Sequence, residues 1–352
     1  MKKVRGPIRL VAVIALIAGF GFSTIAPSIA QDDAVETVAV ITPSAVTNLG
    51  WDQQAADGIN AVADKMGITA LIQENGGYDD ISPALNDLAA DGAQLIICHA
   101  SGYQTVCPEF AETEGVKVAV IENPDAVNDN VADIETQAQE VAYLAGLLAG
   151  LQTQTGTVGV VVSGEPPTWN YMTVGFAEGL NASNPDATLI YSVIGEAAYD
   201  DAAGAKRVTE QQLANGADII FGMGDGASFG MIEAVREFNE DEANADTPAM
   251  FIDVIGDKSE EYSDVLLTSV LFDYSGIYEQ MINNIPAGEF GQVYTMDISN
   301  GGVRLLDLPD SVSPEVREAV ETAEAGIVDG SIEVSAIGDA DGMNARLDEL
   351  GY

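Results

Sequence analysis

Residues 37–67, TVAVITPSAVTNLGWDQQAADGINAVADKMG, join an apolar strand to an amphipathic helix. The opening TVAVIT (37–42) is rich in Val and shows no polar alternation, which is typical of a strand buried on both faces. From Gly50 to Gly67 apolar residues recur at helical spacing. Trp51, one of two tryptophans, stands where the loop meets the helix. Ligands of open α/β sheets bind beyond the carboxyl ends of strands, so this position favours a binding role for Trp51.

The same alternation of buried strands and helices continues along the chain. We expect further strands at 68–74, 93–100, 116–122, 155–164, 187–195, 217–224 and 249–257. Helices are expected at 80–92, 107–115, 134–154, 171–184, 201–216 and 229–240. Because the pattern restarts at residue 155, it predicts an α/β fold of two doubly wound parallel-sheet domains.

The elements after residue 257 are too few for a third domain. They comprise the apolar run 264–273, a helix at 275–285, a hairpin-like segment at 293–309 and a helix at 313–326. We expect them to complete the two sheets, so that the chain crosses between the domains several times. The first domain is predicted to be 31–154 plus about 272–305, and the second 155–271 plus about 306–352.

The first thirty residues have the layout of a cleaved secretory signal. Basic residues precede a short apolar run, and small residues precede Gln31. The alternative is an uncleaved anchor, although the run is short of the roughly 20 residues that span a bilayer. No cysteine stands at the expected cleavage point to carry a lipid. We therefore expect an exported protein, in the periplasm or at the outer face of the cytoplasmic membrane.

The charge of the chain excludes several classes of partner. All 56 acidic residues but only nine of the 13 basic ones follow residue 30, which gives the mature chain a formal charge of −47. Nucleic acid and anionic membrane surfaces would be repelled by this field. An acidic surface with few lysines is also typical of adaptation to high salt, where counterions screen the repulsion.

Residues suited to catalysis or metal binding are few. His99 is the only histidine, and it does not complete a Ser/His/Asp set or a tetrahedral metal site with Cys98 and Cys107. The two cysteines of an exported chain are as compatible with a disulfide as with two buried thiols. A glycine-rich segment at 222–230 lacks the phosphate-binding spacing. We expect no enzyme, cofactor or metal, although a hydrolase using two of the many carboxylates stays an alternative.

Aromatic and polar residues recur instead at the predicted strand ends, as in a small-molecule pocket. They are Asn48, Trp51, Ser101, Tyr103, Trp169, Tyr171, Asp225, Asp253, Asp257, Phe272 and Tyr274. Each also has a structural interpretation. The aromatic residues could pack in the core, Asp225 could cap a helix or form a turn, and Asp253 could be a buried structural carboxylate.

Several segments resemble the basic membrane protein (BMP) family of ABC transporter substrate-binding proteins, which includes the purine nucleoside receptor lipoproteins. The resemblance spans about residues 37–335. It rests on EVAYLAGLLAG (140–150), VGFAEGLNASNPDA (174–187), Tyr199-Asp200-Asp201-Ala202 leading into QLANGADIIF (212–221), LLTSV (266–270) and NGGVRLL (300–306). It implies a type I periplasmic-binding fold with three crossings between the domains.

The resemblance also implies roles for individual residues. Trp51 takes the place of the aromatic residue that stacks on a base. Asn48 stands where the family has a carboxylate, and Asp52 stands where it has an amide. The lysine that holds ribose in nucleoside binders is absent, since Phe272 stands three residues after Ser269. This departure resembles a branch with aromatic residues there, so the ligand is expected to be a purine base, a nucleoside or another flat ring. Asp225, Asp253 or Asp257 would accept hydrogen bonds from ring N–H groups.

We therefore expect a monomeric receptor that closes two domains over a small molecule and delivers it to an ABC permease. A sensor of the same fold, which hands a sugar or signal molecule to a receptor, is the alternative.

Overall fold

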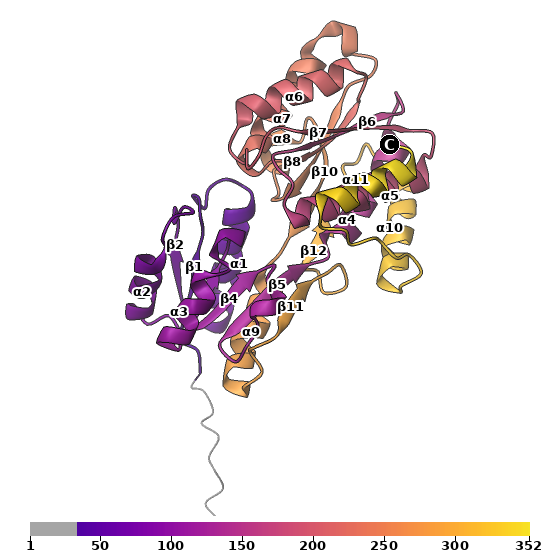
Figure 1. Cartoon of the computed structure of the whole chain (residues 1–352). Coiled ribbons are helices and arrows are strands. Elements are labelled where there is room, and N and C mark those ends of the chain that lie inside the picture. Colours follow the sequence, from indigo (N-terminus) through magenta and orange to yellow (C-terminus); the bar gives the residue numbers. More distant parts are fainter. Residues whose placement is uncertain (1–33) are drawn as a thin grey trace, which may run out of the picture. The chain divides into compact units, whose positions relative to one another are not determined.

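Two six-stranded sheets form the framework of the protein (Figure 1). The computed structural model describes residues 34–352, all of which belong to one compact unit. The predicted signal peptide, residues 1–30, lies outside the described residues. Within the described part of the chain, no helix is both long enough and apolar enough to cross a membrane. The α/β class with two parallel-dominated sheets is confirmed.

The first sheet has the strand order β11-β5-β4-β3-β1-β2, and all its neighbouring strands are parallel. Its strands are β1 (Thr37–Ile41), β2 (Thr69–Gln73), β3 (Leu95–Cys98), β4 (Lys117–Ile121), β5 (Val131–Thr136) and β11 (Val293–Met296). The helical elements along this part of the chain are α1 (Trp51–Met66), α2 (Ser82–Ala90), η1 (Ser101–Tyr103), α3 (Val106–Glu114), η2 (Pro124–Ala126) and α9 (Ser275–Ala287).

The second sheet has the order β12-β10-β9-β8-β6-β7 and is parallel except for β12, which runs antiparallel to β10. Its strands are β6 (Thr157–Val162), β7 (Thr188–Val193), β8 (Ile219–Met223), β9 (Met250–Ile255), β10 (Leu266–Phe272) and β12 (Val303–Leu305). The remaining helical elements are α4 (Ala138–Gln152), α5 (Pro167–Ser183), α6 (Ala202–Ala214), η3 (Asp225–Ala227), α7 (Ser228–Glu240), η4 (Glu242–Asn244), α8 (Ser259–Tyr262), α10 (Pro314–Val328) and α11 (Ala340–Leu350).

The hydrophobic core explains why most strands carry no polar alternation. One cluster fills the side of the first sheet that faces α2 and α3, and another fills the side of the second sheet that faces α6 and α7. A larger cluster covers the opposite sides of both sheets and includes residues of α1, α4, α5, α9 and α10. Each central strand is therefore buried on both faces, as the Val/Ile runs predicted.

Four features differ from the sequence-based prediction. Residues 131–136 form strand β5, and the following helix begins only at Ala138, because pairing with β4 and β11 extends this segment. The segment 293–309 is not a hairpin, since β11 and β12 pair in different sheets. Helix α5 begins at Pro167, ahead of the helix predicted at 171–184, so Trp169 lies in its first turn rather than before it. Helix α11 was not predicted from the sequence.

The position of α4 bears on the domain limits. Tyr143 and Gly146 of α4 lie directly against α5, where a Cβ on Gly146 would collide with the backbone of Phe176. Strand β12 likewise pairs with β10, although the sequence placed residues up to 305 in the first domain. We therefore propose that the first crossing lies at Gln137, ahead of the limit at residue 154 that the sequence suggested, and that a later one lies between β11 and β12.

Candidate ligand-binding site

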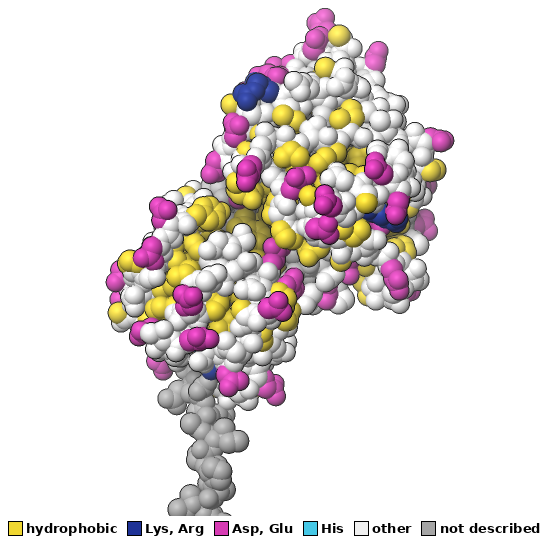
Figure 2. Space-filling model, viewed as in Figure 1, with side chains coloured by type: hydrophobic (Ala, Val, Ile, Leu, Met, Phe, Trp, Pro, Cys, Tyr) yellow, Lys and Arg dark blue, Asp and Glu magenta, His cyan; other side chains and the backbone are white. Residues whose placement is uncertain are grey.

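A cavity of about 660 Å³ opens between the carboxyl ends of the strands of the two sheets. The first sheet lines it with residues that follow β1, β2, β3 and β4, and the second with residues that follow β6, β7 and β8 and with the end of β9. Figure 2 shows hydrophobic side chains gathered where this face of the molecule is hollowed. The location is the one at which open α/β sheets bind ligands.

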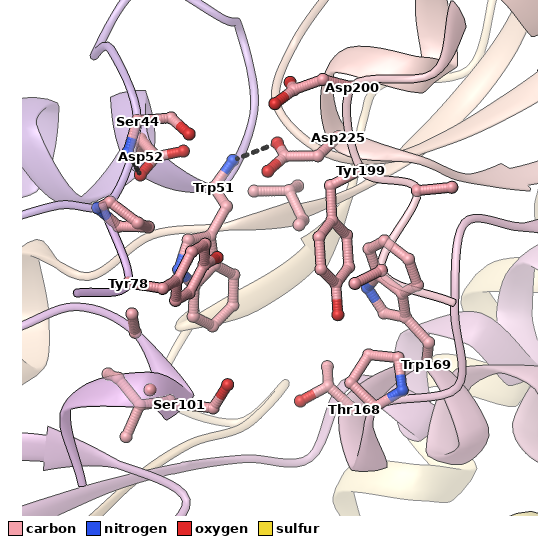
Figure 3. Close-up of a pocket in the computed structure, with 18 of the residues that line it drawn as sticks. Ser44, Trp51, Asp52, Tyr78, Ser101, Thr168, Trp169, Tyr199, Asp200 and Asp225 are labelled. Atoms are coloured by element: carbon pink, nitrogen blue, oxygen red, sulfur yellow. Dashed lines mark hydrogen bonds between the residues drawn. The ribbon is translucent and has the colours of Figure 1, made fainter. Parts of the chain in front are cut away.

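Four aromatic side chains line the cavity from opposite sides (Figure 3). Trp51 and Tyr78 follow β1 and β2 of the first sheet, and Trp169 and Tyr199 follow β6 and β7 of the second. Trp169 and Tyr199 contact each other edge to face, with ring centroids 5.3 Å apart. Tyr78 is 64% exposed at the edge of the cavity, whereas Trp169 is only 5% exposed. Such aromatic faces suit a flat or apolar ligand.

Trp51 is held in place by His99, the residue that follows β3. The two rings stack with centroids 4.4 Å apart, and His99 Nε2 lies 3.1 Å from the Trp51 carbonyl oxygen. The Trp51 indole N–H donates to the His99 carbonyl at 3.4 Å. Burial lowers the pKa of His99 to about 3, so its ring is neutral. Phe272 and Tyr274 contact the Trp51 ring edge-on and complete its support.

Asp225 links the second sheet to the beginning of α1. Its Oδ1 accepts a hydrogen bond of 3.0 Å from the Trp51 backbone N–H, and it thereby caps a helix whose N-cap residue, Gly50, has no side chain to do so. A Cβ on Gly50 would collide with this carboxylate, so any larger residue there would have to displace the Asp225 side chain. Burial raises the pKa of Asp225 to about 7, and the nearby Asp52 contributes to the rise.

Further carboxylates surround the cavity, namely Asp52, Glu122, Asp200 and Asp201. Asp52 accepts hydrogen bonds from the Ser44 N–H and the Asn48 amide, and burial raises its pKa. Glu122 accepts a hydrogen bond from the hydroxyl of Thr168, which follows β6 of the second sheet, and burial also raises the pKa of Glu122. Asp201 caps α6 by accepting from the Gly204 N–H.

The backbone around the cavity is strained. Six non-glycine residues in the described chain have a positive φ, and four of them line the cavity: Glu122, Ala197, Asp225 and Ile255. Ile255 is β-branched and adopts a φ of 73°, which is strongly disfavoured for such a residue. Strained residues concentrate at functional sites, so this clustering is typical of a cavity with a function.

A disulfide stabilises one wall of the cavity. Cys98 and Cys107 are joined, which decides between the two alternatives that the sequence left open. The bridge encloses η1 and the lining residues Ala100, Ser101 and Gly102. Among the described residues there is no cluster of His, Cys, Asp and Glu that could hold a metal ion.

The structure brings together five of the predicted site residues. Trp51, Asp52, Ser101, Trp169 and Asp225 line the cavity. Asn48 does not line it but positions Asp52 through the hydrogen bond to the Asp52 carboxylate.

The other six predicted residues lie elsewhere. Tyr274 is buried and contacts the Trp51 ring edge-on. Tyr103 is buried and donates its hydroxyl to the Gly77 carbonyl, while the ring of Tyr171 lies beside Gly338. Asp253 is buried in an ion pair with Lys258. Asp257 caps the turn at Ser259, and both it and the buried Phe272 line a smaller cavity behind α1.

Several cavity residues escaped the sequence analysis, namely Tyr78, Glu122, Thr168, Tyr199 and Asp200. Tyr199 and Asp200 stand in a segment that was noted only for its family resemblance, and Glu122 ends a predicted strand. Their positions after β4 and β7 were the available signal. Tyr78 lies in a loop after β2 with nothing in the local sequence to mark it.

Known proteins resemble this chain over most of its length. It is 24% identical over 288 residues to the transcriptional activator protein Med of Bacillus subtilis, covering 81% of this chain and 86% of Med. It is 25% identical over 219 residues to the ABC transporter nucleoside-binding protein BmpA of Lactococcus lactis, covering 58% of this chain and 60% of BmpA. The chain thus spans about three fifths of the latter protein.

Solved structures share the fold at low sequence identity. A solute-binding protein of an ABC transporter system from Aeropyrum pernix superposes with a TM-score of 0.75 at 21% identity, covering 90% of this chain and 97% of that one. A transcriptional activator of the comK gene from Bacillus halodurans superposes with a TM-score of 0.69 at 18% identity, covering 84% of this chain and 98% of that one. These neighbours confirm the periplasmic-binding fold that the resemblance implied.

The family itself follows from a match along nearly the whole described chain. Residues 35–337 match the model of the Bmp family, described as ABC transporter substrate-binding protein PnrA-like. This range contains the cavity and both sheets. The chain therefore belongs to the Bmp family of PnrA-like ABC transporter substrate-binding proteins.

Proposed function

We propose that this substrate-binding protein captures a small flat-ring molecule, a purine base or a nucleoside, outside the cytoplasmic membrane and delivers it to an ABC permease. The observation that supports this most directly is the cavity between the two sheets, with Trp51 and Tyr78 on one side and Trp169 and Tyr199 on the other. A flat ring placed against such faces gains both apolar burial and stacking. The similarity to the nucleoside-binding protein BmpA favours the same class of ligand.

Contacts across the cavity, between segments of the first sheet and segments of the second, suit a protein that encloses its ligand. The Trp51 N–H donates to Asp225, and the Thr168 hydroxyl donates to Glu122. The loop at Leu49 also lies so close to Gly256 that a Cβ there would collide with the Leu49 carbonyl. We propose that ligand binding stabilises this closed arrangement and that the segments crossing between the sheets act as the hinge.

Thermal unfolding against a panel of bases, nucleosides, sugars and amino acids tests the proposal. A ligand at one hundred times its dissociation constant adds about 2.7 kcal/mol, which raises Tm by a few degrees in a chain of this size. Comparing each base with its nucleoside shows whether a ribose is recognised. If only sugars or amino acids raise Tm, the purine assignment is wrong.

Single substitutions then locate the ligand. Trp51→Ala and Tyr199→Ala should each weaken binding by about 1–3 kcal/mol in calorimetric titrations, the range found for stacking of a base on an aromatic ring. Tyr262→Ala is the matched control, because Tyr262 lies away from the cavity and packs against Arg236. Unchanged affinity in both cavity variants would place the ligand elsewhere.

A sensor function is the second candidate, and the similarity to Med favours it. A sensor would bind its ligand in the same cavity but pass the closed state to a protein partner rather than to a permease. Uptake of labelled ligand by cells with and without the gene separates the two functions. Transport should fall on deletion if the protein serves a permease, whereas only gene expression should change if it is a sensor.

A further inference from the structure

The cavity has an unusual balance of charge. Five carboxylates line it, from Asp52, Glu122, Asp200, Asp201 and Asp225. Among the residues that the structure describes, no Lys, Arg or His lines it. We propose that the ligand carries a positive charge on nitrogen, a property that a neutral base or nucleoside lacks. This inference rests on the proposed function, because it concerns the ligand of the same site.

The protein itself offsets only part of this negative charge. Asp225 and Asp201 each accept a hydrogen bond at the beginning of a helix, α1 and α6, where the helix dipole favours an anion. Lys258 attracts Asp225 and lowers its pKa, but Lys258 is buried in an ion pair with Asp253, so most of its charge is already paired. Asp52 and Glu122 are bonded to neutral groups only. The Asp200 carboxylate has no hydrogen bond or ion pair to any described residue, whereas its backbone carbonyl accepts from the Ala202 N–H.

The geometry leaves acceptors free for a ligand. Asp225 uses Oδ1 for the Trp51 N–H, and Oδ2 has no partner among the described residues. Figure 3 shows the Asp225 and Asp200 carboxylates beside Tyr199 at the same edge of the cavity. An ammonium, guanidinium or protonated ring nitrogen placed there would meet carboxylate oxygens as acceptors.

The aromatic side chains that line the cavity also favour a positively charged ligand. The faces of Trp and Tyr rings attract cations through the ring quadrupole, and Trp attracts them more strongly than Tyr or Phe does. Burial is the main cause that raises the pKa values of Asp225, Asp52 and Glu122, and repulsion from neighbouring carboxylates adds to the rise. A bound cation would relieve this repulsion, whereas a phosphorylated ligand would increase it.

Pairs of probes that differ in charge but little in shape test the inference by calorimetry on the mature protein. The pairs are 1-methyladenosine, a cation at neutral pH, with the neutral N6-methyladenosine; 1-methylnicotinamide with nicotinamide; and choline with 3,3-dimethyl-1-butanol. We expect the cation of at least one pair to bind tenfold or more tightly than its neutral partner. Adenosine 5′-monophosphate should bind more weakly than adenosine.

Variants connect the preference to the cavity. Asp225→Asn and Asp200→Asn should each reduce the ratio of cation to neutral affinity at least threefold. Asp310→Asn, which removes the same charge from an exposed position outside the cavity, should leave the ratio unchanged.

The outcomes separate this inference from the proposed function. If neutral probes bind as tightly as cations in every pair, or if no cation binds, the inference is overturned. If adenosine and N6-methyladenosine bind and no pair favours its cation, the flat-ring function stands while the charge inference falls. If choline alone binds, the charge inference stands and the purine assignment falls.

Discussion

Trp51 and His99 hold each other by a stacked contact and by hydrogen bonds between each ring and the other residue's backbone carbonyl. The consequence is that a fully buried residue outside the cavity fixes the orientation of an aromatic ring that lines it. The position of the tryptophan at the mouth of a loop is explained in the same way. One side of the ring is supported by protein, and the residue still lines the cavity.

His99→Ala should therefore weaken ligand binding without touching the ligand. Loss of the stacked ring leaves a cavity beneath Trp51, and we expect unfolding to be easier by about 2–4 kcal/mol. The variant is best made in a Trp169→Phe background, because Trp51 is then the only tryptophan and its fluorescence reports its surroundings. A shift of the emission to longer wavelength is expected. His99→Phe, which keeps a stacked ring, is the control, and equal spectra for the two variants would contradict a positioning role.

Asp225 should make the protein less stable as the pH rises from about 4 to about 7. Burial raises the pKa of Asp225 in the folded state to about 7 from its ordinary value of 3.8, so the folded protein binds a proton that the unfolded chain releases. The favourable contribution of this proton to the free energy of unfolding is complete below pH 3.8 and is lost as the pH rises through about 7. The pKa of Glu135 is likewise raised by burial to about 7, which adds a slope of the same sign.

The variant Asp225→Asn isolates this contribution. Asparagine keeps an oxygen for the Trp51 N–H but cannot ionise, so the variant should be more stable than the natural protein at pH 8 and nearly equal to it at pH 4. Urea denaturation at pH 4, 6 and 8 in high salt measures the difference. Asp310→Asn serves as the control for net charge. A pH dependence identical in Asp225→Asn and the natural protein would show that Asp225 does not titrate in this range.

The sequence predicted the repeated strand and helix units because burial on both faces and helical spacing are local properties of the chain. It missed β5, whose residues become a strand only by pairing with β4 and with the distant β11. It likewise joined β11 and β12 in a hairpin, since nothing local shows that they belong to different sheets. Among the site residues, Trp51 and Asp225 stood out at strand ends. Tyr78 did not, because its loop reaches the cavity only through the fold.

The contact between Gly256, which follows β9 of the second sheet, and Leu49, which follows β1 of the first, can be tested by substitution. A Cβ there would collide with the Leu49 carbonyl, so Gly256→Ala should disfavour the closed arrangement and weaken ligand binding at least tenfold. Small-angle scattering should also show a larger radius of gyration for the variant with ligand present. Gly276→Ala is the control, because no heavy atom lies within 4 Å of its added Cβ. Full affinity in Gly256→Ala would mean that this contact plays no part in closure.

The glycines of the YLAGLLAG and GFAEG segments allow α4 and α5 to pack backbone to backbone. A Cβ on Gly146 would overlap the Phe176 carbonyl, and one on Gly179 would overlap the Tyr143 carbonyl. Because backbone atoms cannot move aside as a side chain can, Gly146→Ala and Gly179→Ala should each lower the free energy of unfolding by about 2–4 kcal/mol. Urea denaturation measures the loss, with Gly276→Ala expected to be neutral or slightly stabilising. Neither glycine lines the cavity, so the folded fraction of each variant should retain its ligand affinity. If affinity fell and stability did not, these segments would serve binding rather than packing.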